Sequence, residues 1–492
     1  MPGKKFSAIL LLPVVFTVTA LLVFLPILGN TFLSDDYDSL YRIVIQKRIL
    51  YREFLRPMID VSFLFNYRLS GLSPFGFYLF NLLIHIINSL LVVRLVRQNG
   101  GVYDQAAIVS GLLFLVYPFH NEGIVWLSGR LSSMACMFAL LAMSVSIGKP
   151  SRFNLPLAIL FYLLGMLCYE SIILLPIMIV LIRYGKTGLK RVLRVELPLW
   201  LAAALVYPIA RFILSGEIVG SYASRVTNNN LGGKLANIVK VTARLLLPPS
   251  ENTSLLVTLA FLFAAVLAFL HWRAYRQKSK SNFNYTILLS LLFLSLVVPW
   301  AFGVSTRTSE GDRLLYFPSV FICILLAVWL QVMIKSAGVQ NIVLGLLLLT
   351  CIVQLEVNNL HWKKASAIAN QLKEAAVDPH TLTLAVVNLP GDYKGAFIFR
   401  NGFKKMLSIN KVNVQKVKVL SEPDGRLNEY RLPVWQPGMA REEWQLPPFV
   451  VVSELGSDSL RFTNSYDKTN IRIRKKSLEL LYWNNQHLFK LL

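Results

Sequence analysis

Acidic side chains stand at the ends of long apolar stretches, where few other charges occur. Asp35 and Asp36 belong to a Ser-Asp-Asp-Tyr-Asp segment directly after the first such stretch. Glu122 lies in a short His-Asn-Glu-Gly turn, and Glu170 lies between two further apolar stretches. A carboxylate in such a place can take the proton from an attacking hydroxyl group. These residues are therefore candidates for acid–base chemistry.

Arginines stand near the same stretch ends and indicate a negatively charged substrate. The four are Arg56, Arg130, Arg307 and Arg313. Guanidinium groups that are fixed before reaction stabilise the charge that grows on a departing phosphate. Carboxylates and arginines together at a membrane boundary predict group transfer from a lipid-linked phosphate donor to an acceptor hydroxyl.

Membrane helices are the elements that must position these side chains. The chain has 492 residues, of which 55% are apolar and 15% are charged. An ordinary soluble protein has about 45–50% apolar and about 25% charged residues. The composition therefore excludes a disordered chain, a coiled coil and a disulfide-stapled secreted domain, and it argues against a large soluble enzyme. The cysteines lie inside apolar stretches and are expected to behave as small hydrophobic residues.

Apolar windows predict about eleven transmembrane helices, since a bilayer core of about 30 Å needs about 20 apolar residues per helix. The predicted spans are 6–28, 75–97, 105–119, 124–147, 154–168, 170–184, 195–214, 252–271, 285–304, 313–334 and 339–357. We therefore expect an all-α polytopic membrane protein.

Basic residues predict how these spans are oriented. Lys and Arg number 50 and Asp and Glu 26, so the formal net charge is +24. With a cytoplasmic N-terminus, every predicted inner connection carries at least one Lys or Arg, as the positive-inside rule requires. The candidate acids and arginines then lie on the outer face, together with the C-terminus. We expect a plasma membrane, typically a bacterial inner membrane, with anionic lipids rather than nucleic acid as partners.

Composition changes near residue 361, where long apolar stretches end and charges of both signs return. We expect a transmembrane domain over 1–360 and a small extracytoplasmic domain, α+β and mostly β, over 361–492. Turn signals bound expected strands near 382–387 and 396–399. Within the first domain, residues 29–74 form the first outer loop, where apolar and basic residues over 40–55 predict a helix lying in the membrane interface.

Simpler structural roles are open for the candidate acids. Asp35 and Asp36 could cap the helix that follows them in a solvated loop. Glu122 could be a turn residue paired with Arg130. Glu170 is harder to assign to a purely structural role. A carboxylate flanked by apolar segments raises the free energy of the folded protein, and such a residue is expected to have a function.

Simpler roles are also open for the candidate cations and histidines. Arg307 and Arg313 could be interfacial anchors. His85, in the middle of a predicted span, is expected to be a hydrogen-bonded packing residue. His120 lies at a helix end beside Glu122, where packing and substrate binding are both open to it.

Short motifs occur in a fixed order across residues 30–185 and 305–325. They are Ser-Asp-Asp-Tyr-Asp, Arg56-Pro57, Asn66-Tyr67, Gly71-Leu72-Ser73-Pro74-Phe75-Gly76-Phe77, Asn81, His85, Tyr117-Pro118-Phe119-His120-Asn121-Glu122, Trp126-Leu127-Ser128-Gly129-Arg130, Tyr169-Glu170-Ser171, Leu175-Pro176, Asp312-Arg313, Tyr316 and Pro318-Ser319. The series resembles GT-C membrane glycosyltransferases, and in particular the O-mannosyltransferase-like group that carries tetratricopeptide repeats. Residues 361–492, which we call the tail, lack those repeats. Asp312-Arg313 stands where that group more often has Glu-Arg. The identity of the sugar and of the acceptor therefore stays open.

The resemblance implies a GT-C-like fold and an inverting transfer of one sugar from a polyprenyl-phosphate carrier to an extracytoplasmic glycan, lipid or protein. It implies that Asp35 or Asp36 is the base and that Arg313 binds the donor phosphate. We expect Asp35 to be the base, and Asp36 to orient the acceptor or a divalent metal ion such as Mg²⁺ or Mn²⁺. The other candidates are assigned to the sugar or acceptor (His120, Glu122, Glu170) and to the donor phosphate (Arg56, Arg307, Arg313).

Two other functions compete with this hypothesis. A transporter or lipid flippase would need ionisable groups near the bilayer midplane and two related halves. The sequence indicates neither, apart from a recessed position for Glu170. A GT-C-like scaffold that has lost catalysis would tolerate replacement of Asp35, Asp36 and Arg313.

Overall fold

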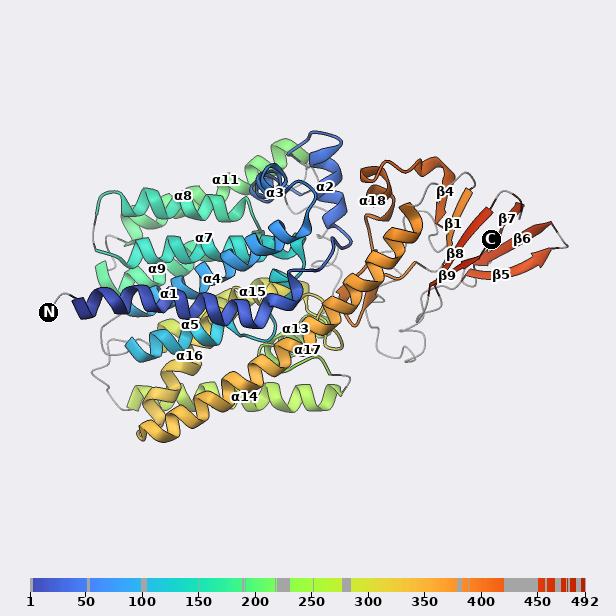
Figure 1. The fold of residues 1–492 in the computed structure, drawn as a ribbon. Helices are drawn as coiled ribbons and strands as arrows, with labels where there is room; N and C mark the ends of the chain where they lie inside the picture. Colours follow the sequence, from blue (N-terminus) through green and yellow to red (C-terminus); the bar gives the residue numbers. More distant parts are fainter. Residues whose placement is uncertain are drawn as a thin grey trace. The chain divides into compact units, whose positions relative to one another are not determined.

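The computed structural model divides the chain into two compact units (Figure 1). One unit is formed by Met1–Gly29 and Ile49–Leu360, and the other by Asn30–Arg48 and His361–Leu492. The structure describes residues 3–50, 54–98, 104–149, 151–187, 190, 192–216, 218, 231–250, 252–276, 285–377, 383–387, 389–419, 450–455, 458–464, 470–474, 476, 478–483 and 488–491.

The first unit is built from helices. They are α1 (Gly3–Phe24), η1 (Leu25–Ile27), α3 (Pro57–Ser70), α4 (Pro74–Gln98), α5 (Asp104–Leu115), α6 (Asn121–Ile124), η2 (Leu127–Gly129), α7 (Arg130–Ile147), α8 (Asn154–Met166), η3 (Glu170–Ile172), α9 (Leu175–Thr187), η4 (Val192–Glu196), α11 (Leu197–Ser215), α13 (Leu231–Arg244), α14 (Thr253–Arg276), α15 (Tyr285–Phe302), η6 (Asp312–Leu315), α16 (Pro318–Met333) and the first part of α17 (Ala337–Val377). Each predicted apolar stretch overlaps one or more of these helices.

Several of these helices are suited to a bilayer. Among the described residues, five are long and apolar enough to cross a membrane, namely Pro74–Gln98, Leu127–Ile147, Val192–Ser215, Tyr285–Phe302 and Ala337–Val377. Shorter apolar helices cover Leu11–Ile27, Asp104–Leu115, Asn154–Met166, Ser254–Phe269 and Pro318–Met333. The chain is therefore a helical, multi-pass membrane protein, and the count of eleven spans stays a prediction.

The core of the first unit lies between α4, α5, α7 and α16. Helix α4 packs against α5 and α7, and α16 packs against α5 (Figure 1). His85 of α4 lies at this junction, where Nδ1 is 2.6 Å from the Tyr316 hydroxyl and Nε2 is 2.9 Å from the Leu115 carbonyl oxygen. This confirms the packing role expected for His85.

Helix α17 continues beyond the predicted end of its span at residue 357 and ends at Val377. The composition change at His361 does not end the helix, because a buried stripe with helical spacing follows it. The buried residues of that stripe are Trp362, Ala365, Ile368, Ala369, Leu372 and Ala376. Such spacing is typical of an amphipathic helix, so α17 begins in the first unit and ends in the second.

The second unit combines short helical segments with short strands. Its elements are α2 (Asp36–Val44), the end of α17, β1 (Thr383–Val387), β2 (Asp392–Tyr393), β3 (Ala396–Phe397), α18 (Phe403–Ile409), η7 (Val414–Lys416), β4 (Val417–Val419), β5 (Val450–Leu455), β6 (Ser459–Asn464), β7 (Asn470–Arg474), β8 (Leu478–Trp483) and β9 (Leu488–Leu491). Strands thus lie near 382–387 and 396–399, as predicted.

The larger sheet has the order β4-β1-β8-β9. Strand β1 is parallel to β4 and β8, with Leu384 opposite Val417 and Thr383 opposite Leu478, and β8 is antiparallel to β9. Strands β5, β6 and β7 form a separate antiparallel sheet.

Helix α2 differs from the interfacial helix expected over 40–55. It begins at Asp36 and ends at Val44, and Lys47 has a φ of 55°, which a continuing α-helix does not allow. Its buried face includes Leu40 and Ile43, and α2 packs against α18. The apolar face therefore contacts protein. Residues 51–53 lie outside the described residues.

Candidate functional site

Glu122 and Arg313 are in contact although 191 residues separate them in the sequence. Glu122 belongs to the single-turn helix α6, and Arg313 to η6. Glu122 Oε2 accepts a hydrogen bond of 2.9 Å from the Arg313 backbone N–H, and Oε1 forms an ion pair with the Arg313 guanidinium. The Glu122 side chain is fully buried, whereas 23% of the Arg313 side chain is exposed. Arg313 is thus the accessible member of the pair.

Two glycines allow the turn that carries Glu122 to close. A Cβ atom on Gly129 would lie 1.8 Å from the Glu122 carbonyl oxygen, and one on Gly123 would lie 2.9 Å from the Tyr316 ring. Neither distance is compatible with a side chain. The glycines of the two motifs around Glu122 are therefore explained by close approach of backbone and ring.

The Glu122 carboxyl is shifted toward its neutral form. Burial raises the pKa of Glu122, and the charge and hydrogen bonds of Arg313 offset only part of that rise. The Arg313 guanidinium also lies 5.3 Å from the centre of the Trp126 ring. An aromatic face attracts such a cation, so Arg313 is held from two sides.

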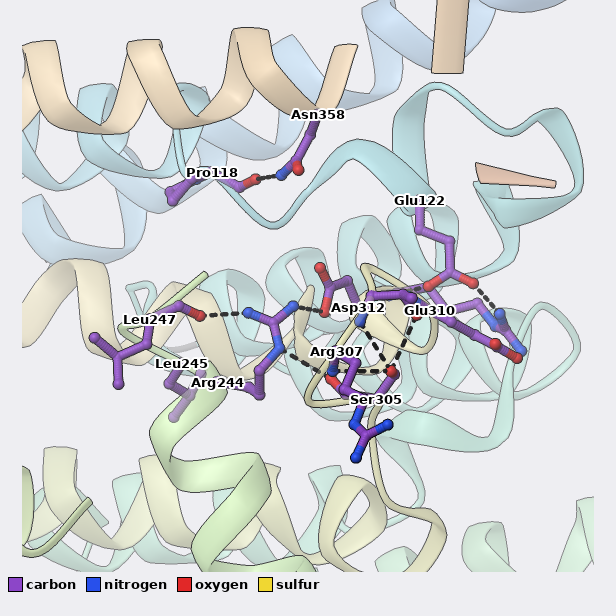
Figure 2. A network of polar contacts seen from close by, with 12 residues as sticks. Pro118, Glu122, Arg244, Leu245, Leu247, Ser305, Arg307, Glu310, Asp312 and Asn358 are labelled. Atoms are coloured by element: carbon purple, nitrogen blue, oxygen red, sulfur yellow. Dashed lines mark hydrogen bonds and ion pairs between the residues drawn. The ribbon is translucent and has the colours of Figure 1, made fainter. Parts of the chain in front are cut away.

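A second buried ion pair lies directly before Arg313. Asp312 Oδ1 is 2.5 Å from Nη2 of Arg244, and both side chains are almost fully buried. Figure 2 shows the Arg244 guanidinium between the Leu247 carbonyl and the Asp312 carboxylate. Its Nε donates to the Ser305 carbonyl oxygen at 3.0 Å. Arg244 therefore fixes the loop that leads into η6.

Burial raises the pKa of Asp312 to about 7, while Arg244 lowers it and nearby Glu122 raises it further. Two carboxyl groups with raised pKa values thus share one network. Burial therefore favours the neutral form of both carboxyl groups.

Arg307 lies on the loop between α15 and η6 (Figure 2). Ser305 Oγ shapes this loop by accepting from the backbone N–H groups of Arg307 at 3.3 Å and Thr308 at 3.1 Å. Burial lowers the pKa of Lys240, and the charge of Arg307 lowers it further. Arg307 is half-buried and lies in the same loop as Asp312. Its charge acts on Lys240, so the two cations lie near each other.

Arg56 and Glu170, predicted separately, form an ion pair of 2.9 Å. Glu170 also accepts hydrogen bonds from the Tyr207 hydroxyl at 2.7 Å and from Arg211 at 2.8 Å. Burial raises the pKa of Glu170, but Arg56 and Tyr207 outweigh it, so the net pKa lies below the ordinary value. The Arg56 guanidinium is further held 4.9 Å from the Tyr169 ring centre.

Asp35 and Asp36 lie in the second unit. Asp35 is half-buried, and its Oδ1 accepts a hydrogen bond of 2.7 Å from the Asn401 side chain. Asp36 is fully buried, and its Oδ2 accepts from the Leu33 backbone N–H at 3.0 Å. Asp35 occupies the N-cap position of α2, but its side chain makes no capping hydrogen bond. The Asp35 side chain therefore does not have the capping role that the sequence left open.

His120 is fully buried among aromatic rings. Its Nε2 lies 2.7 Å from Ser319 Oγ, and its ring centre lies 4.3 Å from that of Tyr316 and 4.6 Å from that of Phe114. Burial lowers the pKa of His120 well below its usual value, and His85 lowers it further. The imidazole is therefore neutral at physiological pH.

Arg130 is not the partner of Glu122, so that simpler interpretation is wrong. Arg130 is fully buried, and its guanidinium donates to Asn81 at 2.7 Å and to Asn66 at 2.6 Å. Its carbon centre lies 4.6 Å from the Phe63 ring centre. Arg130 thus joins α3, α4 and α7.

Four partners were missed at the sequence level. Arg244 lies on α13, an amphipathic helix that a search for long apolar windows passes over, although its helical periodicity could have indicated it. Tyr207 and Arg211 are one turn apart on α11, and Arg211 is a charge inside the predicted span 195–214, which itself marks a site. Asn401 belongs to an Asn-Gly turn signal, which indicates a turn but not a contact with Asp35.

Asparagines of α17 hold the segment before Glu122. Asn358 donates to the Pro118 carbonyl oxygen at 2.8 Å (Figure 2), and Asn121 donates to the Asn359 side-chain oxygen at 2.6 Å. Asn359 in turn donates to the Val23 carbonyl oxygen at 3.1 Å. Buried amides with these bonds fix the end of α1 and the 118–121 segment to one helix.

Within the described part of the chain, no group of three or more His, Cys, Asp or Glu side chains is gathered to hold a metal ion. Asp36, the residue proposed to orient a metal, is buried and occupied by the Leu33 N–H. The residues present therefore do not fit a divalent metal site at Asp36.

Sequence comparison finds relatives for part of this chain. It is 33% identical over 150 residues to Protein O-mannosyl-transferase Tmtc3 of Drosophila melanogaster, covering 25% of this chain and 16% of the relative. It is 34% identical over 91 residues to Protein O-mannosyl-transferase TMTC1 of Homo sapiens, covering 18% of this chain and 10% of that protein. The N-terminal part of the chain is homologous to O-mannosyltransferases. This confirms the predicted resemblance.

The homologous part is short relative to these proteins. The match to Protein O-mannosyl-transferase F38B6.6 of Caenorhabditis elegans has 25% identity over 181 residues and spans 32% of this chain and 26% of the relative. No family model matches the chain. Among solved structures, the chain is similar to ArnT from Cupriavidus metallidurans bound to undecaprenyl phosphate, with 16% identity, a TM-score of 0.49, and coverage of 82% of this chain and 89% of that one.

Proposed function

We propose that this protein is a GT-C-type membrane glycosyltransferase that moves one monosaccharide from a polyprenyl-phosphate donor to an extracytoplasmic glycan, lipid or protein. The observation that carries the proposal is the homology of its N-terminal part to proteins named as O-mannosyltransferases. The apolar helices support a donor whose polyprenyl tail stays in lipid, because they are long and apolar enough to cross a membrane.

The reaction is a single displacement at the anomeric carbon of the donor sugar. The acceptor oxygen forms a bond to that carbon as the bond from carbon to the phosphate oxygen breaks, so the configuration inverts. The hydroxyl proton passes to the base carboxylate, and polyprenyl phosphate leaves with the electron pair of the broken bond. The protein supplies a base, cations for the leaving phosphate and a fixed geometry.

Asp35 is the proposed base. Its carboxylate is half-buried and is oriented by Asn401 through Oδ1, whereas Asp36 is buried and holds the Leu33 N–H. A base must reach the proton that it abstracts. The exposure of Asp35 therefore supports it over Asp36, whose role is to fix the turn that precedes α2.

Arg313 and Arg56 are the proposed ligands of the donor phosphate. Their side chains are 23% and 17% exposed, and each is pre-oriented by an ion pair with a carboxylate, Glu122 for Arg313 and Glu170 for Arg56. An arginine held in this way presents its remaining N–H groups without further ordering. Arg307, on the same loop as η6, is the third proposed cation.

Glu122, Glu170 and His120 act on the site through these arginines and through packing. Glu122 is fully buried against Arg313, and Glu170 holds Arg56. His120 is buried and neutral, so it supports the segment that carries Glu122 rather than exchanging a proton. All of these residues, with the C-terminus, are proposed to face outward from a plasma membrane, because the basic residues fall on the opposite connections.

The test is a transfer assay with the full chain in liposomes that contain polyprenyl-phosphate [¹⁴C]mannose and a panel of peptide, glycan and lipid acceptors. We expect labelled product with the wild type and a loss of at least about 100-fold with Asp35→Asn, the range of a general base. Lys363→Ala, an exposed position, is the matched control. Full activity of correctly folded Asp35→Asn and Asp36→Asn variants would overturn the mechanism.

Controls for the other functions use the same liposomes. Movement of the labelled lipid between leaflets without product would indicate a flippase. Inactivity of the wild type on every polyprenyl-phosphate sugar tested would favour a scaffold.

A further inference from the structure

The Ser-Asp-Asp-Tyr-Asp segment is separated from the tail by more than three hundred residues of sequence, yet both belong to the second unit. Residues 30–48 pack with residues 361–492 in that unit. The segment that carries the proposed base therefore contacts residues after 361, and a side chain from among them, Asn401, binds the Asp35 carboxylate.

Backbone contacts fix the start of the acidic segment. The Ser34 N–H donates to the Ile398 carbonyl oxygen at 2.8 Å, and the Asn401 N–H donates to Ser34 Oγ at 3.2 Å. Ser34 has a φ of 45°, which is uncommon for a residue other than glycine. The tail thus stabilises an unusual backbone conformation next to Asp35.

Gly402 permits this close approach. A Cβ atom there would lie 2.4 Å from the Ser34 carbonyl oxygen and 3.1 Å from Tyr37 Cβ, and Gly402 itself has a φ of 82°. A side chain at this position would push the acidic segment away. The two chain segments are therefore fitted to each other at the level of the backbone.

The contact that bears on chemistry is made by Asn401. Its amide nitrogen donates to Asp35 Oδ1 at 2.7 Å. A donor on one carboxylate oxygen sets the plane of the group and directs the other oxygen, Oδ2, outward from the contact. Because Asn401 is also held through its backbone, its side chain is a fixed support.

Two further contacts anchor the same segment, one to α18 and one to the residues before it. Lys405 forms an ion pair with Asp38, and the Tyr37 ring stacks on Phe399 with centres 5.9 Å apart and an angle of 24°. Helix α2 packs directly on α18. The acidic segment therefore cannot turn while α18 stays in place.

We propose that Asn401 is a positioning residue for the transfer reaction, and that the 398–405 segment completes the catalytic site by orienting the Asp35 carboxylate. The proposal rests on the proposed function, in which Asp35 is the base. It goes beyond it by giving the tail a part in catalysis: removing the Asn401 amide disorders the base without touching the donor.

The test measures kcat, KM for the donor and the pH dependence of kcat/KM for Asn401→Ala and Asn401→Asp in the full chain. Asn401→Ala should lower kcat by about 10-fold to 100-fold, while KM for the polyprenyl-phosphate sugar changes less than about twofold. The acidic limb of the pH profile should move to higher pH, because the ionised base has lost a donor.

Asn401→Asp keeps the size of the side chain and places a second carboxylate beside Asp35. It should move the acidic limb further than Asn401→Ala does, since two adjacent carboxylates resist ionising together. Lys404→Ala, an exposed neighbour on α18, is the control and should keep the wild-type kcat and profile. A merely structural role for Asn401 would change the amount of folded enzyme but not the pH limb.

The outcomes separate this inference from the function on which it rests. If Asp35→Asn is inactive but both Asn401 variants keep the wild-type kcat and the wild-type acidic limb of the pH profile, the positioning role of Asn401 is wrong. Asp35 then keeps its assignment as the base. If Asp35→Asn is fully active, the proposed function itself fails. If Asn401→Ala does not fold, the positioning role is tested by the acidic limb of the kcat/KM profile of the isosteric variant Asn401→Asp.

Discussion

Arg244 and Asp312 are joined by an ion pair of 2.5 Å in which both side chains are withdrawn from solvent. The guanidinium of Arg244 also binds the carbonyl groups of Leu247 and Ser305. One arginine thus connects the end of α13 to the loop before η6. Because Arg313 follows Asp312 directly, the position of the proposed phosphate ligand depends on this pair.

Removing Arg244 should destabilise the membrane unit strongly. Arg244→Met leaves a buried carboxyl group and two carbonyl groups without their donor, at a cost of about 3–5 kcal/mol, as for other broken buried pairs. We expect a clear fall in the melting temperature of the detergent-purified protein. Asp312→Asn keeps an acceptor for Arg244 and should cost much less, so equal losses in the two variants would contradict this account.

Stability should fall as pH rises through neutrality because of Asp312. Its pKa is raised from 3.8 to about 7 by burial, so between these values the folded chain holds a proton that the unfolded chain has released. The contribution is present below the unfolded value and is lost as pH rises through about 7. Asp312→Asn should flatten this part of a melting curve series between about pH 5 and pH 8, and an unchanged slope would show that another group titrates.

Glu170 should have the opposite dependence on pH. Arg56 and Tyr207 outweigh its burial and lower its pKa, so its contribution is present above the ordinary value of 4.5 and is lost as pH falls below it. Glu170→Gln should therefore lower the melting temperature most at neutral pH, where Arg56 and buried Arg211 lose their counter-charge. Glu356→Gln is the control, since no contact with an arginine is made by that side chain in the described residues. The prediction fails if Glu170→Gln melts like the wild type at pH 7.

Arg313 should act on the donor more than on the fold. Its guanidinium is partly exposed and held by Glu122 and the Trp126 ring. Arg313→Ala should reduce kcat/KM for the polyprenyl-phosphate sugar by about 10-fold to 100-fold, the range of one charge-assisted hydrogen bond. Arg152→Ala, at an exposed position, should leave it unchanged. Equal kcat/KM values in the two variants would remove Arg313 from the phosphate site.

Gly129 should not accept a side chain. The Cβ atom of Gly129→Ala would meet the Glu122 carbonyl oxygen at 1.8 Å, and backbone atoms cannot move aside as a side chain does. We expect loss of folded protein or of the Glu122–Arg313 pair, measured as yield and melting temperature. Gly345→Ala, on α17 with open space around it, should fold normally. Normal stability of Gly129→Ala would contradict the tight turn.

Apolar windows located the helices well, because burying a backbone in lipid requires them to be helical and composition alone reveals such segments. The same windows could not find α13, which is amphipathic rather than apolar throughout. They also ended α17 too early, since the helix continues past His361 with its apolar residues confined to one face. Composition reports the environment of a helix rather than its length.

The ionic partners were harder to predict than the acids themselves. Glu122, Glu170, Arg56 and Arg313 were all marked by their positions at the ends of apolar stretches, but which acid meets which arginine depends on helix packing. Glu122 could equally have met nearby Arg130, and it instead pairs with an arginine 191 residues away. Asn401 was marked only as part of an Asn-Gly turn signal, because the sequence of a turn does not reveal which distant carboxylate its amide contacts.

The inclusion of residues 30–48 in the C-terminal unit gives the protein an order of assembly. Asp35 leaves the ribosome 366 residues ahead of Asn401. A nascent chain that stops before residue 401 would therefore contain the proposed base without its support. Competence for the reaction would then arise only after Asn401 had been synthesised and its segment had folded back onto residues 30–48.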